Sequence, residues 1–167
     1  MRRQKIYLET SLFNFYVDED RGTAHYDTVK LFEHIAAGKY EPFTSTYVTE
    51  ELKGAQEEKR DKMLKIIDDY SITVLNTIEE VGSIADIYVA EGVIPQKYVM
   101  DGLHIAIATV YGLDMIVSMN FHHIVKQKTI RMTESINILN GYRAVEICSP
   151  TEVVENEEKD RSDRAGD

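Results

Sequence analysis

Short apolar or β-branched runs alternate with amphipathic helical patterns, and this alternation limits the possible fold more than any other feature. The runs KIYLE, YEPFTS, SITVLN, MIVSMN and AVEICS predict strands. Between them, AHYDTVKLFEHIAAG has Val29, Phe32 and Ile35 on one helical face and Gly38 as a stop signal. Strands that alternate with helices of about 10 to 15 residues predict βαβ units. We therefore expect an α/β three-layer sandwich with a central parallel sheet and helices on both faces.

Other segments extend the same pattern. EEKRDKMLKIIDDY is typical of an amphipathic helix with Met63, Ile66 and Ile67 facing inward. TIEEVGSIADIYVAEG and KYVMDGLHIAIATVYG both end on glycine, a common helix terminator. INILNGYRAVEICSP predicts a last helix, a glycine turn and an edge strand.

The length of 167 residues suits one domain, which we place at residues 1–150. The sequence after Pro150, TEVVENEEKDRSDRAGD, loses apolar residues, so 151–167 is predicted to be a charged, flexible tail. Apolar runs stay shorter than the roughly 20 residues that a membrane helix needs. MRRQKIYLE also passes into a strand without a signal-peptide pattern, so a cytoplasmic protein is expected.

The net charge of −10 argues against a large nucleic-acid-binding face. The charge is uneven, because residues 152–167 carry seven acids and three bases. Residues 121–133, FHHIVKQKTIRMT, instead contain three Lys or Arg and two His with no acid. A local basic patch is therefore predicted within an acidic protein. Cys148 is the single cysteine, which excludes an intramolecular disulfide, and we expect it to be packed in the core.

Acids and an amide occur where the predicted strands end. Glu9 ends the first strand, and Glu50 and Glu51 lie in the helical pattern after the second. Asp101 lies early in the helical segment YVMDGLHIAIA, and Asn120 ends the fourth strand. Ligands of open parallel sheets bind beyond the carboxyl ends of the strands. We therefore expect these positions to meet at one end of the sheet.

Each of these residues also has a purely structural interpretation. Glu9 alone is typical of a turn, and Glu50 with Glu51 suits the first turn of a helix through the macrodipole. Asn120 is a suitable N-cap for FHHIVK. Asp101 is harder to explain, because it precedes an almost wholly apolar helix. Together, clustered carboxylates repel unless protons or cations neutralise them, and Mg²⁺ or Mn²⁺ prefers such oxygens. Phosphodiester hydrolysis suits this arrangement.

Neighbouring polar residues are candidates for binding metal waters or RNA phosphates, with capping or a solvated basic face as the alternative. They are Thr10, Ser11, Ser118, His122, His123, Lys126 and Lys128. Of these, Ser11, Ser118, His123 and Lys126 are predicted to bind substrate. His104 shares a helical face with Asp101, but a histidine on an apolar helix is more often a hydrogen-bonded core residue.

The chain resembles the PIN-domain nucleases, especially the VapC-like toxins of toxin-antitoxin pairs. The resemblance runs from IYLETSLFN through FTSTYVTEEL and DGLHIAIATVYGLDMIVSMNFHHI to GYRAVEICSPTEV. On matching positions it implies that Glu9, Glu51, Asp101 and Asn120 hold Mg²⁺ or Mn²⁺ and carry out catalysis. It further implies cleavage of single-stranded RNA, a cognate antitoxin and a homodimer.

Two positions depart from the family pattern. Glu9 stands where Asp is commoner, and Asn120 replaces an acid, which puts a tightly held second metal in doubt. The alternative is a degenerate PIN-like module that binds RNA or a protein. A flavodoxin-like domain is excluded because ETSLFNFY places bulky aromatics where a phosphate loop would lie. A phosphoacceptor receiver is excluded because the third strand ends in Asn76.

Overall fold

The computed structural model of the chain describes residues 2–166 and contains one five-stranded parallel sheet. The strands lie in the order β3-β2-β1-β4-β5. Their bounds are β1 Gln4–Leu8, β2 Tyr40–Ser45, β3 Thr73–Leu75, β4 Met115–Val117 and β5 Glu146–Cys148. Tyr7 in β1 pairs with Phe43 in β2 and Ile116 in β4. The first strand in sequence is therefore the central strand of the sheet.

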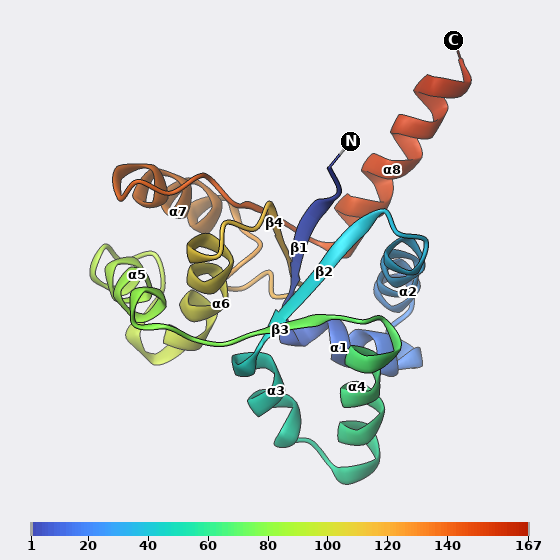
Figure 1. Cartoon of the computed structure of the whole chain (residues 1–167), viewed down its shortest axis with the longest axis horizontal. Coiled ribbons are helices and arrows are strands. Elements are labelled where there is room, and N and C mark those ends of the chain that lie inside the picture. The colour runs from blue at the N-terminus through green and yellow to red at the C-terminus, as the bar shows by residue number, and fades with distance from the viewer. Residues whose placement is uncertain (1, 167) are drawn as a thin grey trace.

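Helices cover both faces of this sheet, which confirms the predicted three-layer α/β fold (Figure 1). One face carries α1 Thr10–Val17, α2 Thr23–Ala36, α4 Glu57–Asp69 and α8 Pro150–Ala165. The other carries α5 Glu79–Ala90, α6 Val99–Val110 and α7 Gln127–Leu139. The short helix α3, Thr46–Lys53, directly follows β2, and single 3₁₀ turns lie at Glu19–Arg21 and Gln96–Tyr98.

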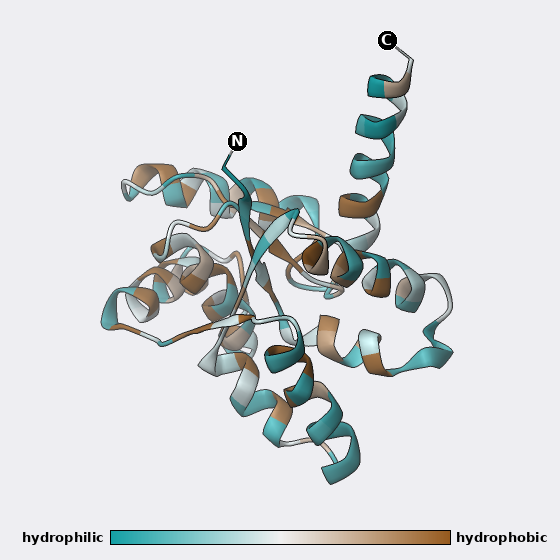
Figure 2. Cartoon of the chain, turned by 45° about the vertical axis from the view of Figure 1, so that its right-hand side comes forward, coloured by the Kyte–Doolittle hydropathy of each residue, from teal (hydrophilic) through white to brown (hydrophobic). Residues whose placement is uncertain are grey.

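The core lies where the apolar runs predicted it. Ile6, Tyr7 and Leu8 of β1 are fully buried, and so are Ile105 and Ile107 of α6. Burial on both faces explains why β1 reads as a nearly continuous apolar run. Figure 2 shows apolar segments among the strands and helices of the body, whereas the outer part of α8 is mainly hydrophilic.

The C-terminal segment, predicted to be a charged, flexible tail over 151–167, is helical over most of its length, and Asp167 lies outside the described residues. Residues Pro150–Ala165 form α8, which begins with a capping box between Ser149 and Glu152. Val153 is buried against the body, and Glu157 accepts hydrogen bonds from Lys39 and from a second side chain, that of Tyr40. A cap, two buried valines and a few polar contacts dock the first turns of this helix, while the flexibility of the segment stays a prediction. The domain boundary at residue 150 stays a prediction.

Two further segments differ from expectation. Residues 10–17 form helix α1, which the aromatic-rich sequence did not indicate. FHHIVK, residues 121–126, forms turns, and α7 begins only at Gln127. The burial of Ile124 and Val125 pulls this segment inward and interrupts the helical path.

Cys148 is a free, buried thiol, as predicted, and burial raises its pKa well above the ordinary value. Across residues 2–166, every helix is too short or too polar to cross a bilayer.

Candidate active site

Glu9 is held firmly at the end of β1, where it also forms the N-cap of α1. It is only 5% exposed. Its Oε1 accepts hydrogen bonds from Ser11 N at 3.2 Å, Ser11 Oγ at 2.5 Å and Ser118 Oγ at 2.6 Å. Among residues 2–166, the side-chain hydrogen bonds to this carboxylate all end on Oε1, so Oε2 is the oxygen left for a ligand.

Two serine hydroxyls join the ends of β1 and β4. Ser118 Oγ donates to Glu9 and accepts from Asn120 N at 2.9 Å. Ser11 Oγ accepts from Met119 N at 2.8 Å. Both hydroxyls thus orient protein groups, and Ser118 is fully buried. The structure places Ser11 and Ser118 around Glu9 rather than on an open substrate-binding surface, because the adjacent strands bring them into contact.

Asn120 caps a turn, whereas its structural interpretation was the N-cap of a helix over FHHIVK. Its Oδ1 accepts from His123 N at 3.0 Å. The backbone N–H of Asn120 donates to Ser118 Oγ, so Asn120 and Glu9 share one hydrogen-bonded network.

Asp101 lies in the first turn of α6 and is joined to the same network through His123. His123 Nδ1 donates to Asp101 Oδ2 at 2.9 Å. His123 is only 8% exposed, and its ring packs against Tyr98 with a centroid separation of 4.1 Å. The structure therefore makes His123 a partner of Asp101 and does not place it as an open phosphate-binding side chain, because the 121–126 turn folds inward.

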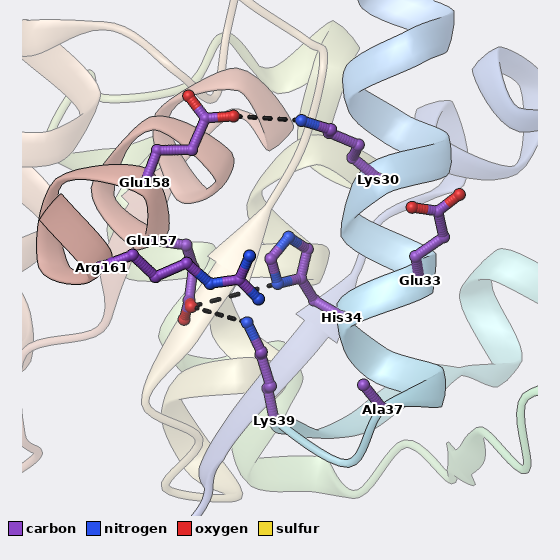
Figure 3. Close-up of a pocket in the computed structure, with 8 residues that line it drawn as sticks. All are labelled: Lys30, Glu33, His34, Ala37, Lys39, Glu157, Glu158 and Arg161. Atoms are coloured by element: carbon purple, nitrogen blue, oxygen red, sulfur yellow. Dashed lines mark hydrogen bonds and ion pairs between the residues drawn. The ribbon is translucent and has the colours of Figure 1, made fainter. Parts of the chain in front are cut away.

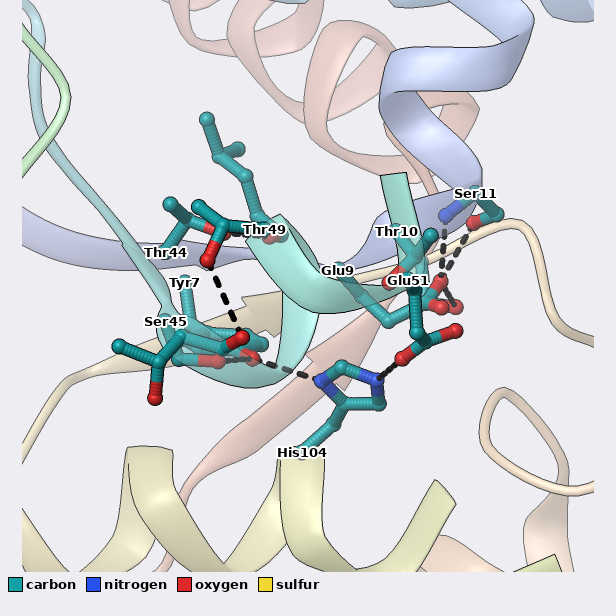
Figure 4. Close-up of polar contacts among 12 residues, drawn as sticks. Tyr7, Glu9, Thr10, Ser11, Thr44, Ser45, Thr49, Glu51 and His104 are labelled. Carbon is teal, nitrogen blue, oxygen red and sulfur yellow. Dashed lines mark hydrogen bonds and ion pairs between the residues drawn. The ribbon is translucent and has the colours of Figure 1, made fainter. Parts of the chain in front are cut away.

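Glu51 in α3 is bonded to His104 in α6 (Figure 4). A carboxylate only accepts, so His104 Nε2 donates to Glu51 Oε1, at 2.7 Å. The other ring nitrogen, Nδ1, lies 2.6 Å from Tyr7 OH, which in turn lies 2.7 Å from Ser45 Oγ. Figure 4 shows the imidazole between Tyr7 and Glu51. The expectation of a hydrogen-bonded core histidine matches this placement, since His104 is 1% exposed.

The side chains of Glu50 and Glu51 point to different parts of the molecule. The Glu50 side chain is 71% exposed and accepts from Lys53 Nζ at 3.0 Å on the surface of α3. The Glu51 side chain is 36% exposed and points to buried His104. Glu51 is thus the acid that faces the other candidate residues.

Electrostatics place three acids around His104. Burial lowers the pKa of His104, but the hydrogen bond to Glu51 and the negative charges of Glu9, Glu51 and Asp101 outweigh burial. The pKa of His104 is consequently raised from its ordinary value. The pKa of Tyr7 is raised mainly by burial. The negative charges of Glu9 and Glu51 raise it further, whereas the hydrogen bond with Ser45 lowers it. Three acids therefore act on His104, and two of them, Glu9 and Glu51, also act on Tyr7.

The chemistry of these residues fits a hard divalent cation. Carboxylate and amide oxygens are the ligands that Mg²⁺ and Mn²⁺ prefer. The side-chain hydrogen bonds of Glu9, Glu51 and Asp101 each use one oxygen within residues 2–166 and leave the second for a ligand. As the side chains stand in that part of the chain, no group of three or more His, Cys, Asp or Glu is already arranged to hold a metal. Binding of a metal by these residues would therefore require side-chain movement.

A cavity lies away from these residues, between α2 and α8 (Figure 3). It has a volume of about 200 Å³. Its lining consists of Lys30, Glu33, His34, Ala37, Lys39, Glu157, Glu158 and Arg161. Opposite charges already pair across it, with Lys30 Nζ 3.1 Å from Glu158 and Lys39 Nζ 3.2 Å from Glu157. This cavity contains none of the four candidate residues, and we assign the candidate site to the strand ends instead.

The sequence analysis did not identify Tyr7 and Ser45 as members of the hydrogen-bonded network of His104. It predicted that His123 binds substrate, whereas the structure bonds His123 to Asp101. Tyr7 and Ser45 read as ordinary strand residues and carried no signal of their own. His104 did carry one, because it follows Asp101 by three residues on the same helical face. Lys126 is partly buried at the start of α7, and Lys128 is exposed on the first turn of that helix. Binding of RNA phosphates by either lysine stays a prediction.

Comparison with known proteins identifies the fold. No protein-family model and no curated protein sequence matches the chain. Among solved structures, VapC20 of Mycobacterium tuberculosis, described as a sarcin-ricin loop cleaving toxin, is 13% identical with a TM-score of 0.55. The match covers 84% of this chain and 98% of the VapC20 chain. A chain of VapBC2 from Rickettsia felis, bound to a promoter DNA fragment, is 12% identical with a TM-score of 0.54 and covers 87% and 98%.

Sequence identities of 12% and 13% are evidence for a shared fold only. The strand order, the helices on both faces and the near-complete coverage of those chains agree with the fold that the sequence resemblance implied. The chain has the PIN-like fold of the VapC toxins.

Proposed function

We propose that this protein is a metal-dependent endoribonuclease of the VapC type, which hydrolyses phosphodiester bonds of single-stranded RNA. The observation that carries the proposal is the position of Glu9, Glu51 and Asp101. These acids come from three separate segments, and a hydrogen bond from a neighbouring side chain holds each of them: Glu9 is bonded to Ser118, Glu51 to His104 and Asp101 to His123. Their place at the carboxyl ends of parallel strands is where α/β folds bind ligands.

In this proposal Glu9, Glu51, Asp101 and Asn120 hold Mg²⁺ or Mn²⁺. The bound ion would lower the pKa of a water molecule and neutralise charge on the phosphoryl group. The protein groups around these ligands have positioning roles. Ser11 and Ser118 fix Glu9, His104 fixes Glu51, and His123 fixes Asp101. Lys126, at the start of α7, is proposed to bind an RNA phosphate.

A second candidate is a catalytically weak PIN-like module that binds RNA or a protein. Asn120 favours it, because a neutral amide stands at the fourth position and its Oδ1 already accepts from His123 N. The two candidates differ in whether divalent metal supports RNA cleavage.

Cleavage of a single-stranded RNA by Asp101→Asn, compared with wild type, is the experiment that tests the proposal. Activity should require Mg²⁺ or Mn²⁺, disappear with EDTA and fall by at least about 100-fold in the variant, since loss of a metal-binding charge costs several kcal/mol. Glu50→Gln is the matched control, because Glu50 is an exposed acid next to Glu51 on α3. Equal activity of Asp101→Asn and wild type would indicate a contaminating nuclease and contradict the proposal.

The resemblance also leads us to propose a cognate antitoxin and a homodimer. A small protein encoded by the neighbouring gene should co-purify with this chain and inhibit its cleavage of RNA. Sedimentation at micromolar concentration should give twice the chain mass of 19.1 kDa, and a monomer alone would contradict the dimer.

A further inference from the structure

Two exposed aromatic rings lie next to the candidate site in sequence. Phe121, 52% exposed, directly follows Asn120, and Tyr98, 39% exposed, precedes Asp101 by three residues. Large aromatic side chains gain most from burial, so rings left in solvent beside a polar site call for an explanation.

Aromatic contacts connect this region to Asp101. The ring of His123 packs against Tyr98 at 4.1 Å on one side and against His122 at 4.4 Å on another. His123 is the residue that bonds to Asp101, while Tyr98 and His122 are exposed. The contacting rings of His123, Tyr98 and His122 therefore extend from Asp101 to the exposed surface.

Positive charge accompanies the rings. Lys97 Nζ lies 5.5 Å from the centre of the Tyr98 ring, and Lys97 is exposed. Lys126 and Lys128 follow Phe121 in a stretch, residues 121–133, that contains no acid in a chain of net charge −10. Charge complementarity therefore favours a polyanion over an acidic or purely apolar protein partner.

We propose that the surface formed by Lys97, Tyr98, Phe121, His122 and Lys126, the aromatic-basic surface, binds an unpaired nucleotide of the RNA next to the cleaved phosphate. The inference rests on the proposed function and adds a substrate requirement to it. A base stacks on Phe121, and adjoining phosphates contact Lys97 and Lys126. Aromatic rings beside lysines bind single strands in this way, whereas bases inside a duplex are already stacked and cannot reach a ring.

The absence of tryptophan from the sequence provides a direct test. Phe121→Trp introduces a single tryptophan on the aromatic-basic surface, and its fluorescence should be quenched by a short single-stranded RNA. An abasic oligomer of equal length and charge should leave the fluorescence unchanged. Leu139→Trp is the control, since Leu139 is 85% exposed at the far end of α7, about 18 Å along the helix from its start. Both titrations contain EDTA, so no cleavage occurs.

Binding affinity provides a second measurement. Phe121→Ala should raise the Kd for the single-stranded RNA by about 5- to 150-fold, which is the range for loss of one base-aromatic stack. Phe121→Tyr should keep the wild-type Kd, and equal thermal stability of the variants would show that folding is unaffected.

Three results would overturn the inference. Equal quenching by the abasic oligomer would mean that charge alone binds there, and RNA binding without quenching would place the RNA elsewhere. An emission shift of Phe121→Trp with protein concentration alone would assign the surface to a second copy of the chain. Quenching by RNA together with no cleavage in Mg²⁺ would support the binding inference while contradicting the nuclease, so the two failures are distinguishable.

Discussion

His104 joins two parts of the molecule: its Nε2 lies 2.7 Å from Glu51 Oε1, and its Nδ1 lies 2.6 Å from Tyr7 OH. The first bond connects α6 to α3, and the second connects α6 to the central strand β1. Both ring nitrogens are thus occupied, and the ring cannot turn without breaking a buried hydrogen bond. Glu51 is consequently held at the sheet end by a residue that is itself fixed in the core.

Tyr7→Phe should destabilise the protein, because it removes a hydroxyl from this buried network. His104 Nδ1 and Ser45 Oγ would each lose their contact with that hydroxyl, at a cost of about 1–3 kcal/mol in the free energy of unfolding. Urea denaturation measures this change. Tyr111→Phe is the control, since Tyr111 is 38% exposed and its hydroxyl donates to Asn76 O, where water can substitute. Similar losses in both variants would contradict a special role of burial.

Saturating Mn²⁺ should raise the melting temperature of the wild type. A ligand that binds only the folded state at about 100 times its Kd adds about 2.7 kcal/mol of stability, which corresponds to roughly 5–11 °C at this chain length. Asp101→Asn should be more stable than wild type without metal, because a repulsion with Glu9 and Glu51 is removed, and should respond much less to Mn²⁺. Glu50→Gln should keep the full shift. Differential scanning fluorimetry with and without EDTA is the measurement.

An equal Mn²⁺ response of Asp101→Asn and wild type would mean that the acids form no common metal site. The binding-module alternative would then be the better one.

Asn120→Asp should lower the Mn²⁺ concentration needed for half-maximal RNA cleavage, because it restores a fourth negative charge to the proposed ligand set. The fold should tolerate it, since a carboxylate oxygen can still accept from His123 N. Asn156→Asp is a matched control on the exposed side of α8. If Asn120→Asp and wild type need the same Mn²⁺ concentration, the neutral amide of Asn120 does not limit metal binding.

Asp114 lies at the opposite end of the strands from the candidate site. It should make the free energy of unfolding depend on pH in the acid range. Burial raises its pKa, but the hydrogen bonds from Lys5 N and Arg2 and the charge of Arg143 outweigh burial, and the pKa is lowered. A lowered folded-state pKa stabilises the fold above the unfolded value of about 3.9, and this stabilisation is lost as the pH falls through the folded pKa.

Asp114→Asn should therefore reduce the free energy of unfolding at pH 7 by about 1–3 kcal/mol, the range for a hydrogen-bonded charge. The difference from wild type should shrink steadily below about pH 4. Urea denaturation at several pH values measures it, and a difference independent of pH would show that the charge of Asp114 is unimportant.

The sequence alone determined the layers of the fold and the end of the sheet at which the candidate residues lie. Phe32 and Ile35 indicated a buried helical face, although Val29 is only half-buried, and the apolar run around Tyr7 indicated a strand covered on both sides. Because all strands are parallel, residues that follow them fall at one sheet end, as Glu9, Glu51 and Asn120 do, whereas Asp101 follows no strand directly and lies in the first turn of α6. Their catalytic and metal-binding roles stay predictions.

The tertiary structure decided which side chains meet. Only packing turned Glu51 inward and Glu50 outward, brought Tyr7 to His104 across 97 positions, and turned His123 from solvent toward Asp101. It also docked α8 through Val153 despite a highly charged sequence. The reason is physical: periodicity records whether a side chain is buried, whereas a hydrogen bond between distant residues depends on strand register and helix placement to within a fraction of an ångström.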